Sequence, residues 1–303
     1  MRFLLTRAIG AIALVFAVTS GAVLLAQLAP GDYAGRFDRT PAELAADRHR
    51  LGLDRPMWEQ YTSWLTRTLT LDLGESFAYQ VPVIGLVRER AANTARLAIA
   101  ALAVATLLGI PWGVITGTRD GIVARVLRAL SLFVISVPPL IGAIVLLMFA
   151  AATGWLPVSG MDGPRNFVVP TLALALPIAA MLERLQSQSI GDALRRPSTA
   201  AARARGVSRT RVIWRHAWRQ SLAPILGIYG VVVGSLFSGS FAVEYVTSWP
   251  GLGNLMRMAL MARDTNLVAG CAAAGAAFLA AGILGADVAQ ALTDPRVRGE
   301  GAR

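Results

Sequence analysis

The chain has 303 residues, of which 55% are hydrophobic and only 16% are charged, and its mean hydropathy is +0.54. Soluble domains carry roughly 25% charged residues, so the composition argues against a soluble enzyme and favours an integral membrane protein. The net charge is +11, and all 29 basic residues are arginine. The single cysteine, Cys271, excludes an internal disulfide, and no metal-ligand spacing is present.

Apolar segments divide the chain into candidate membrane spans. A spanning helix needs about 20 predominantly apolar residues. Six segments meet this length or nearly do: residues 8–28, 94–117, 130–152, 167–187, 224–245 and 266–292. The fourth is the weakest, because Pro177 interrupts it and the charged residues Glu183 and Arg184 lie near its end. The sequence therefore predicts an all-α integral membrane protein with six transmembrane helices.

The first segment has features of a signal peptide, since Arg2 and Arg7 precede its apolar run. Its length and the five spans that follow favour a retained first helix, a signal anchor. With the N-terminus in the cytoplasm, seventeen arginines fall at the termini and in inner loops, whereas the short outer loops hold only Arg165, Arg257 and Arg263. The positive-inside rule then predicts a multi-pass protein of the cell membrane with both termini cytoplasmic.

This arginine distribution also explains the basic charge, together with attraction to anionic membrane lipid. Nucleic-acid binding is a poor alternative, because no basic stripe is interleaved with exposed aromatic residues.

A long external segment, residues 30–92, follows the first span. Its turn residues predict one helix that ends near Leu51 and another with Pro56 in its first turn. Four side chains of the second helix fall near one face: Trp58, Tyr61, Trp64 and Leu65. We expect this face to pack on the bundle or to lie at the headgroup level rather than to bind a ligand.

An arginine-rich segment separates the fourth and fifth spans. The sequence predicts one helix from Asp192 to Arg205 with Pro197 near its start, a corner at Gly206, and a second helix from Arg209 to Leu222 capped by Ser208. Pro224 would then open the fifth span. Such charges would be costly inside the bilayer, so residues 190–222, the arginine hairpin, are predicted to form a rigid cytoplasmic docking element.

The stretch "TAAARARGVSRTRVIWRHAWRQSLAPIL" resembles the EAA-type loop of binding-protein-dependent ABC importer permeases, with Ala200 where the family's glutamate commonly stands. It is most similar to the oligopeptide/dipeptide/nickel permease family. Further matches in the same order are "LAPGD" at 28–32, "LGLDRP" at 51–56, "LDLGESF" at 71–77, "SVPPL" at 136–140, "GWLPVSG" at 154–160, "VEYVTSWPGLG" at 243–253 and "TDPRVR" at 293–298. Jointly these motifs resemble the first, or B-type, permease of such a pair.

The resemblance implies one permease domain over residues 1–303: a first span (1–29), the external segment (30–92) and a five-span core (93–303) that includes the hairpin. It implies four kinds of partner: a second homologous permease, two ATPase subunits or domains, an external or periplasmic solute-binding protein, and membrane lipid. ATPase-coupling residues would be Ala202, Arg203, Ala204, Arg205, Gly206, Arg215, His216 and Pro224. For the two hairpin-corner arginines the alternative is anchoring at the membrane surface, and for His216 it is helix packing.

Near the outer end of the fifth span, the side facing the pathway and binding protein would include Glu244, Trp249, Pro250, Gly251 and Gly253. Glu244 is interpreted mainly as a structural residue of the turn, with a role in gating or ligand binding as the alternative.

The chain lacks a GxxxxGK[ST] phosphate loop. We therefore expect no catalytic residue and no cofactor in this chain, with ATP and Mg held by the partner ATPases. The favoured solutes are di- and oligopeptides; nickel chelates or haem are the alternatives. A stand-alone channel or scaffold is a different class of function, but neither requires the arginine hairpin. An intramembrane enzyme is disfavoured because the predicted spans contain no histidine and Asp287 stands alone there.

Overall fold

The computed structural model describes residues 2–36, 40–70, 72–157, 160 and 163–293, without the side chains of residues 2–4, 36, 69 and 289–293. The helices of these ranges are joined by turns and loops, and these ranges contain no β-sheet. The chain forms two compact units. The first contains the described residues up to Arg7, Arg96–Trp249 and the described residues from Ala281 onward, and the second contains Ala8–Ala95 and Pro250–Ala280.

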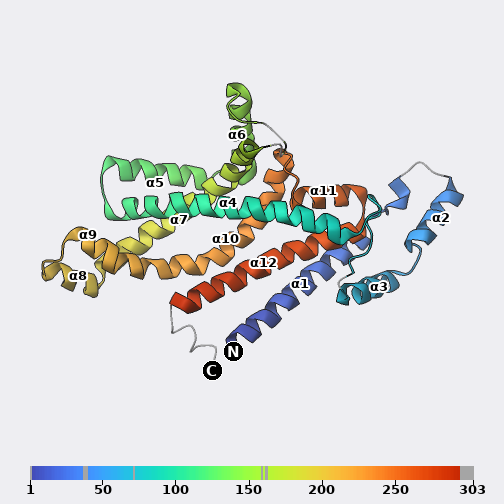
Figure 1. Ribbon diagram of the computed structural model, residues 1–303, viewed down its shortest axis with the longest axis horizontal. Helices are drawn as coiled ribbons and strands as arrows, with labels where there is room; N and C mark the ends of the chain where they lie inside the picture. Colours follow the sequence, from blue (N-terminus) through green and yellow to red (C-terminus); the bar gives the residue numbers. More distant parts are fainter. Residues whose placement is uncertain (1, 37–39, 71, 158–159, 161–162, 294–303) are drawn as a thin grey trace. The chain divides into compact units, whose positions relative to one another are not determined.

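Within the described ranges, five helices are long and apolar enough to cross a membrane (Figure 1): α1 (Arg2–Leu28), α4 (Val83–Thr118), α7 (Val168–Arg195), α10 (Trp218–Val246) and α12 (Thr265–Thr293). They account for the first, second, fourth, fifth and sixth predicted spans. Helix α4 begins eleven residues before the predicted start at residue 94, so part of the predicted external segment is helical and continuous with the second span.

The third predicted span is not one helix. Residues 130–152 are divided between α5 (Ile122–Ile135) and α6 (Pro139–Thr153), which are bent by 107° at the break. Pro138 has extended backbone, as is usual before a proline, and Pro139 occupies the first turn of α6. The prediction of a single spanning helix is therefore wrong here, and a sixth span exists only if the bent pair is counted as one.

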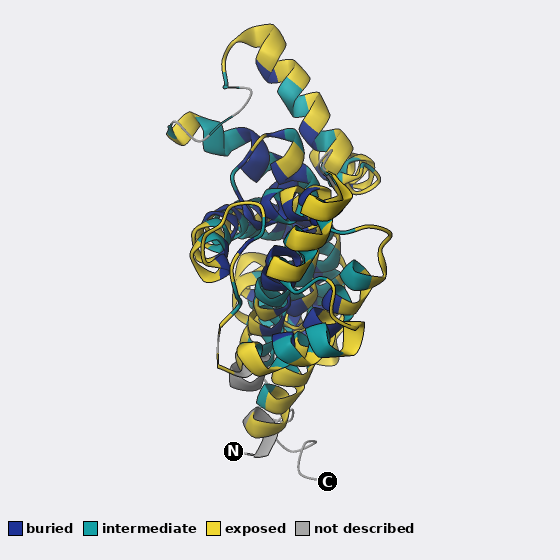
Figure 2. Ribbon diagram, turned by 90° about the vertical axis from the view of Figure 1, so that its right-hand side faces the viewer, coloured by how far each residue is buried: buried dark blue, intermediate teal, exposed yellow. Residues whose placement is uncertain are grey.

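Helix α7 is the centre of the first unit, where it packs against α5, α6 and α10. It continues through Pro177 to Arg195, so the expectation of a weak, interrupted fourth span is wrong. Among the candidate spans of the described chain, its apolar part is the most deeply buried. Figure 2 shows buried residues, in dark blue, alternating with exposed residues, in yellow, along single helices. Burial against neighbouring helices compensates for the backbone hydrogen bond that a proline removes.

The contact between α4 and α7 depends on glycine. Gly109, Gly113 and Gly117 recur at four-residue intervals on α4, and each lies against α7. A Cβ atom at Gly113 would lie 2.5 Å from the Gln186 Cβ and 2.6 Å from the Glu183 carbonyl oxygen. Such small residues let two membrane helices approach closely.

The second unit contains α2 (Pro41–Leu51) and α3 (Met57–Leu69), the short η1 (Ala34–Arg36), and α11 (Leu252–Ala262). A capping box between Thr40 and Glu43 begins α2, and Gly52, at φ +68°, ends it. The predicted end at Leu51 is confirmed. Pro56 is the N-cap of α3 rather than a residue of its first turn.

The predicted aromatic face of α3 is only partly confirmed. Trp64 is buried and clusters with Val23 of α1 and Ala269 of α12, with Tyr61 and Leu65 packed beside them. The Tyr61 hydroxyl donates to the Ser20 Oγ at 3.0 Å. Trp58, by contrast, is 66% exposed and is not part of this cluster.

A buried carboxylate connects the external segment to α12. Asp264 is fully buried; its Oδ2 accepts hydrogen bonds from the Ser76 hydroxyl at 2.6 Å and the Ala78 N–H at 3.1 Å. Its Oδ1 accepts the Leu267 N–H at 3.0 Å in the first turn of α12. These bonds hold the loop after α3 against the start of the last helix.

Candidate coupling hairpin and junction turn

The arginine hairpin begins as a continuation of α7. After α7 ends at Arg195, α8 (Pro197–Ala204) begins with Pro197 in its first turn. The predicted helix from Asp192 to Arg205 is thus two helices, because Arg196 adopts extended backbone before Pro197. Gly206, at φ +78°, makes the predicted corner.

The second arm of the hairpin is not a separate helix. Ser208 is the N-cap of α9 (Arg209–Arg211), although its side chain makes no capping bond. A π-helical segment, η3 (Val212–Ala217), then leads directly into α10. Pro224 lies inside α10 instead of opening it, so the prediction of a boundary there is wrong. The second arm of the hairpin and the fifth span therefore form one continuous helical segment.

Hydrogen bonds and packing hold the hairpin rigidly. Thr199 is buried and its hydroxyl bonds to the Ala193 carbonyl at 2.9 Å and the Arg196 carbonyl at 2.7 Å. The Arg203 Nη2 donates to the Leu194 carbonyl at 2.9 Å, and the Arg209 Nη2 donates to the Thr118 carbonyl at 2.6 Å, at the end of α4. A force on the corner would therefore reach α7, α10 and α4.

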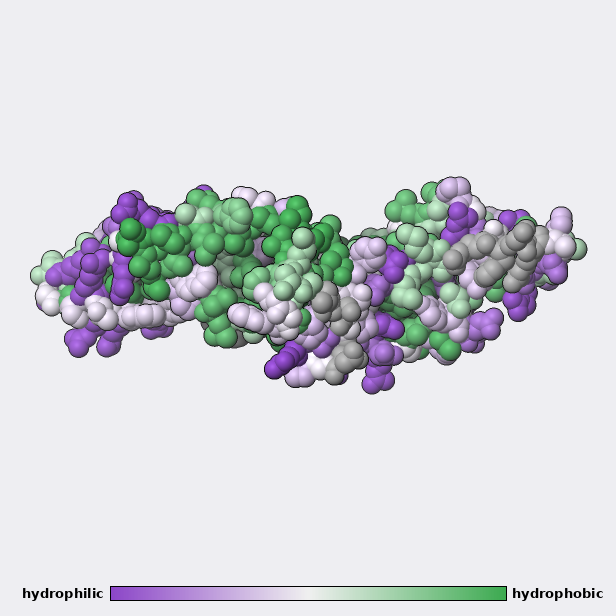
Figure 3. All heavy atoms as spheres, turned by 90° about the horizontal axis from the view of Figure 1, so that it is seen from above, coloured by the Kyte–Doolittle hydropathy of each residue, from purple (hydrophilic) through white to green (hydrophobic). Residues whose placement is uncertain are grey.

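The outer surface of the hairpin is cationic. Its exposed arginines are Arg195, Arg196, Arg203, Arg205, Arg209, Arg211, Arg215 and Arg219. No acidic residue occurs in the sequence between Asp192 and Glu244. Figure 3 shows hydrophilic side chains gathered where α8, α9 and the turn between α4 and α5 end the first unit. This surface suits a partner with an acidic groove.

The predicted coupling residues separate into two groups by burial. Ala202 is fully buried on the inner side of α8, where it supports the corner. Arg203, Ala204, Arg205 and Gly206 are exposed at the corner itself. On the second arm and α10, Arg215 and Pro224 are exposed, whereas His216 is half-buried in the π-helical segment.

The residues predicted near the outer end of the fifth span form a compact turn rather than an open surface. Glu244 and Trp249 are buried in the first unit, and the Trp249 N–H donates to the Glu244 carbonyl at 2.9 Å. The Trp249 and Phe167 rings meet edge to face with centroids 4.9 Å apart.

The remaining turn residues belong to the second unit. Pro250 is half-buried, and its carbonyl accepts a bond from the Asn93 Nδ2 at 2.9 Å. Gly251 and Gly253 are buried, and the Thr94 hydroxyl accepts the Leu252 N–H at 2.8 Å. Helix α11, which the sequence analysis did not predict, begins at this point.

A polar cavity of about 600 Å³ in the first unit was missed by the sequence analysis. Its lining from α4, α5 and α7 includes Thr116, Ser131, Glu183, Ser187 and Asp192. Glu183 is 1% exposed and accepts a hydrogen bond from Thr116. The sequence signal for this position is Glu183 itself, because an ionisable residue within a predicted span is a sign of a functional position.

The fold and the hairpin together define a multi-pass membrane protein with an exposed cationic hairpin. Family comparison identifies it further. Residues 109–299 match the model of the binding-protein-dependent transport system inner membrane component, and residues 1–98 match the model of its N-terminal part. The chain belongs to this family: it is an ABC importer permease of the oligopeptide/dipeptide group and a multi-pass protein of the inner membrane.

Individual relatives agree with this assignment over nearly the full length. The chain is 31% identical to the dipeptide transport system permease protein DppB of Lactococcus lactis subsp. cremoris, with 94% of this chain and 95% of the relative aligned. It is also 31% identical to the glutathione transport system permease protein GsiC of Escherichia coli O6:H1, with 88% and 89% aligned. Transport permeases of this family act with an ATPase and a solute-binding protein.

Proposed function

We propose that this chain imports di- or oligopeptides as one half of a permease pair, driven by ATP hydrolysis in two partner ATPase subunits or domains. The second half would be a homologous permease, and an external binding protein would deliver the solute. Peptide solutes are favoured because the named relatives transport a dipeptide and glutathione, itself a small peptide. The chain itself would have no catalytic role, and ATP and Mg would bind only to the ATPases.

The observation that carries the proposal is the construction of the arginine hairpin. Its corner is exposed and cationic, while its inner side is fixed to the Leu194 carbonyl by Arg203 and to the Thr118 carbonyl by Arg209. A docked ATPase that moves would therefore rotate α7 and α10 as rigid bodies, which is the usual basis of alternating access. The hairpin would lie in the cytoplasm with both termini, as the arginine distribution predicts.

Co-purification tests this function. The tagged chain is extracted from its native membranes in mild detergent, and partners are identified by mass spectrometry. We expect a second permease and ATPase subunits, and we expect ATPase activity of the reconstituted complex to rise when binding protein and peptide are added. Recovery of the chain alone, under conditions that preserve other ABC complexes, would contradict the proposal and favour a channel or scaffold.

A further inference from the structure

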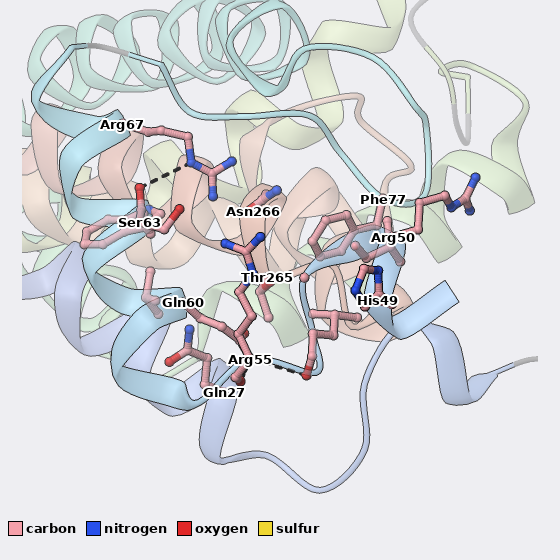
Figure 4. A pocket seen from close by; sticks show the side chains of 15 residues that line it. Gln27, His49, Arg50, Arg55, Gln60, Ser63, Arg67, Phe77, Thr265 and Asn266 are labelled. Carbon is pink, nitrogen blue, oxygen red and sulfur yellow. Dashed lines mark hydrogen bonds between the residues drawn. The ribbon is translucent and has the colours of Figure 1, made fainter. Parts of the chain in front are cut away.

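A cavity of about 330 Å³ in the second unit has no role in the proposed transport cycle. It is formed by the outer end of α1, the corner between α2 and α3, and the start of α12, and Figure 4 shows its lining side chains. Its volume is at the lower end of the range for small-molecule sites.

The cavity is strongly cationic. Arg50, Arg55, Arg67 and His49 line it, and no aspartate or glutamate is among the lining residues. In Figure 4 the Arg55 and Arg67 side chains extend into the same opening, toward Thr265 and Asn266, whereas Arg50 extends away. Within the described residues, neither Arg55 nor Arg67 forms an ion pair with a carboxylate. Two guanidinium groups that share one cavity repel each other unless an anion lies between them.

The acidic residues near the cavity do not supply the anion between these two arginines. Asp72 and Glu75 line an adjoining cavity together with Arg67, but the Asp72 Oδ1 accepts the Gly74 N–H at 2.9 Å. The Arg67 Nε donates to the Ser63 carbonyl at 3.3 Å, which fixes the guanidinium on the cavity side of α3. The fixed fork of an arginine matches the oxygens of a phosphate group.

Two further polar atoms of the lining have no hydrogen-bond partner in the described part of the chain. They are the Trp64 Nε1, a donor, and the Gln27 Oε1, an acceptor. An anion that also carries a hydroxyl group would complement the arginines and supply the donor that Gln27 lacks.

The position of the cavity indicates where that anion comes from. Gln27 is in the last turn of α1, the end of a candidate membrane span, so the cavity lies where the polar headgroups of a bilayer meet the water. Leu25 and Leu28, in the same last turn of α1, are exposed apolar residues suited to acyl chains. We propose that this cavity binds the phosphate of an anionic phospholipid with a hydroxylated headgroup, such as phosphatidylglycerol, between Arg55 and Arg67.

Native mass spectrometry of the purified full-length chain tests this site. Wild-type protein titrated with dioleoylphosphatidylglycerol should retain one lipid tightly, and dioleoylphosphatidylcholine should bind more weakly. The R55Q/R67Q variant should bind phosphatidylglycerol roughly ten- to thirtyfold more weakly, from about one kcal/mol per arginine. The control R88Q/R165Q removes two exposed arginines outside the cavity and should bind as wild type does.

Three results would overturn the proposal: equal binding by wild type and R55Q/R67Q, equal binding of the two lipids, or displacement of the lipid by millimolar inorganic phosphate. The last would identify a free-anion site instead. Hydrogen–deuterium exchange provides a second test. It uses only the wild-type protein, so its result does not depend on whether the variants fold. Residues 49–67 should become protected when phosphatidylglycerol is added but not when phosphatidylcholine is added, and an absence of such protection would also refute the lipid site.

Discussion

Thr116 on α4 donates a hydrogen bond to the buried carboxylate of Glu183 on α7. The Thr116 hydroxyl also contacts the Gly113 carbonyl at 3.3 Å, one turn earlier on its own helix. One polar contact thus joins the two helices between the close contacts made by Gly113 and Gly117. Glu183 lies next to the polar cavity of the first unit, so the same contact orients a carboxylate of its lining.

Substitution T116V should destabilise the protein. Valine has nearly the same shape as threonine but no donor, and a buried charged acceptor that loses its partner costs about 1–3 kcal/mol or more. The thermal unfolding temperature in detergent measures this. T116S, which keeps the hydroxyl, is the control; equal melting of T116V and wild type would show that the contact contributes nothing.

Substitution G113A should separate α4 from α7. Its Cβ would lie 2.5 Å from the Gln186 Cβ, and overpacking of this kind costs about 1–3 kcal/mol. The matched control is G142A on α6, because a Cβ there meets no atom within 4 Å. We expect a lower melting temperature for G113A than for wild type, and an unchanged melting temperature for G142A. A normal melting temperature for G113A would mean that the two helices are not packed as described.

Substitution G206P should uncouple the hairpin without preventing membrane insertion. Proline requires φ near −65°, whereas Gly206 is at +78°. The backbone at the corner must therefore adopt a different conformation in this variant. Peptide uptake should be lost and ATPase activity should no longer respond to peptide. G206N, which tolerates the left-handed conformation, should keep most of both activities; full uptake by G206P would refute the importance of the corner.

The ion pair between Asp32 and Arg48 predicts a local pH dependence. The Arg48 Nε lies 2.7 Å from the Asp32 Oδ2. Burial alone would raise the pKa of Asp32, but the Gly35 N–H and the Arg48 guanidinium together hold it below the ordinary 3.8. The stabilisation is therefore complete above pH 3.8 and is lost as the pH falls through the lower pKa of the folded state.

The size of this effect is limited because both side chains are partly exposed, so we expect at most about 1 kcal/mol. The amides of α2 should lose protection in wild type between pH 4 and pH 2, measured as a fall in the ratio of the intrinsic to the observed hydrogen-exchange rate. D32N should show the lower protection at every pH. Identical corrected profiles for the two proteins would contradict the prediction.

Local turn chemistry was predictable from the sequence. Gly52 and Gly206 both adopt the left-handed conformation expected after a helix, and the predicted end of α2 at Leu51 follows from Gly52. The cationic surface of the hairpin also follows from the sequence, because no acidic residue occurs between Asp192 and Glu244.

Proline positions were harder to interpret, because their effect depends on packing. Pro177 and Pro224 lie inside helices, where neighbouring helices can compensate for a missing hydrogen bond. Pro138 and Pro139, by contrast, break the third span completely. Two consecutive prolines leave the first in extended backbone, a signal that the apolar run around them concealed.

The polar contacts of the interior join residues far apart in sequence, such as Ser76 with Asp264 and Thr116 with Glu183. Hydropathy gives the length of a span but not its rotation about its own axis. The sequence could therefore not assign Glu183 to a buried cavity or bring Arg55 and Arg67 to one opening.

The most direct test of the central claim is peptide uptake, measured together with ATP hydrolysis, in proteoliposomes that contain the complete transporter. The variant R203E/R205E reverses the two arginines at the hairpin corner, and R88E/R165E makes the same change in charge elsewhere. We predict that R203E/R205E assembles in the membrane but loses uptake and peptide-stimulated ATP hydrolysis, while R88E/R165E keeps both. Wild-type uptake by R203E/R205E would contradict the assignment of the hairpin as the coupling element.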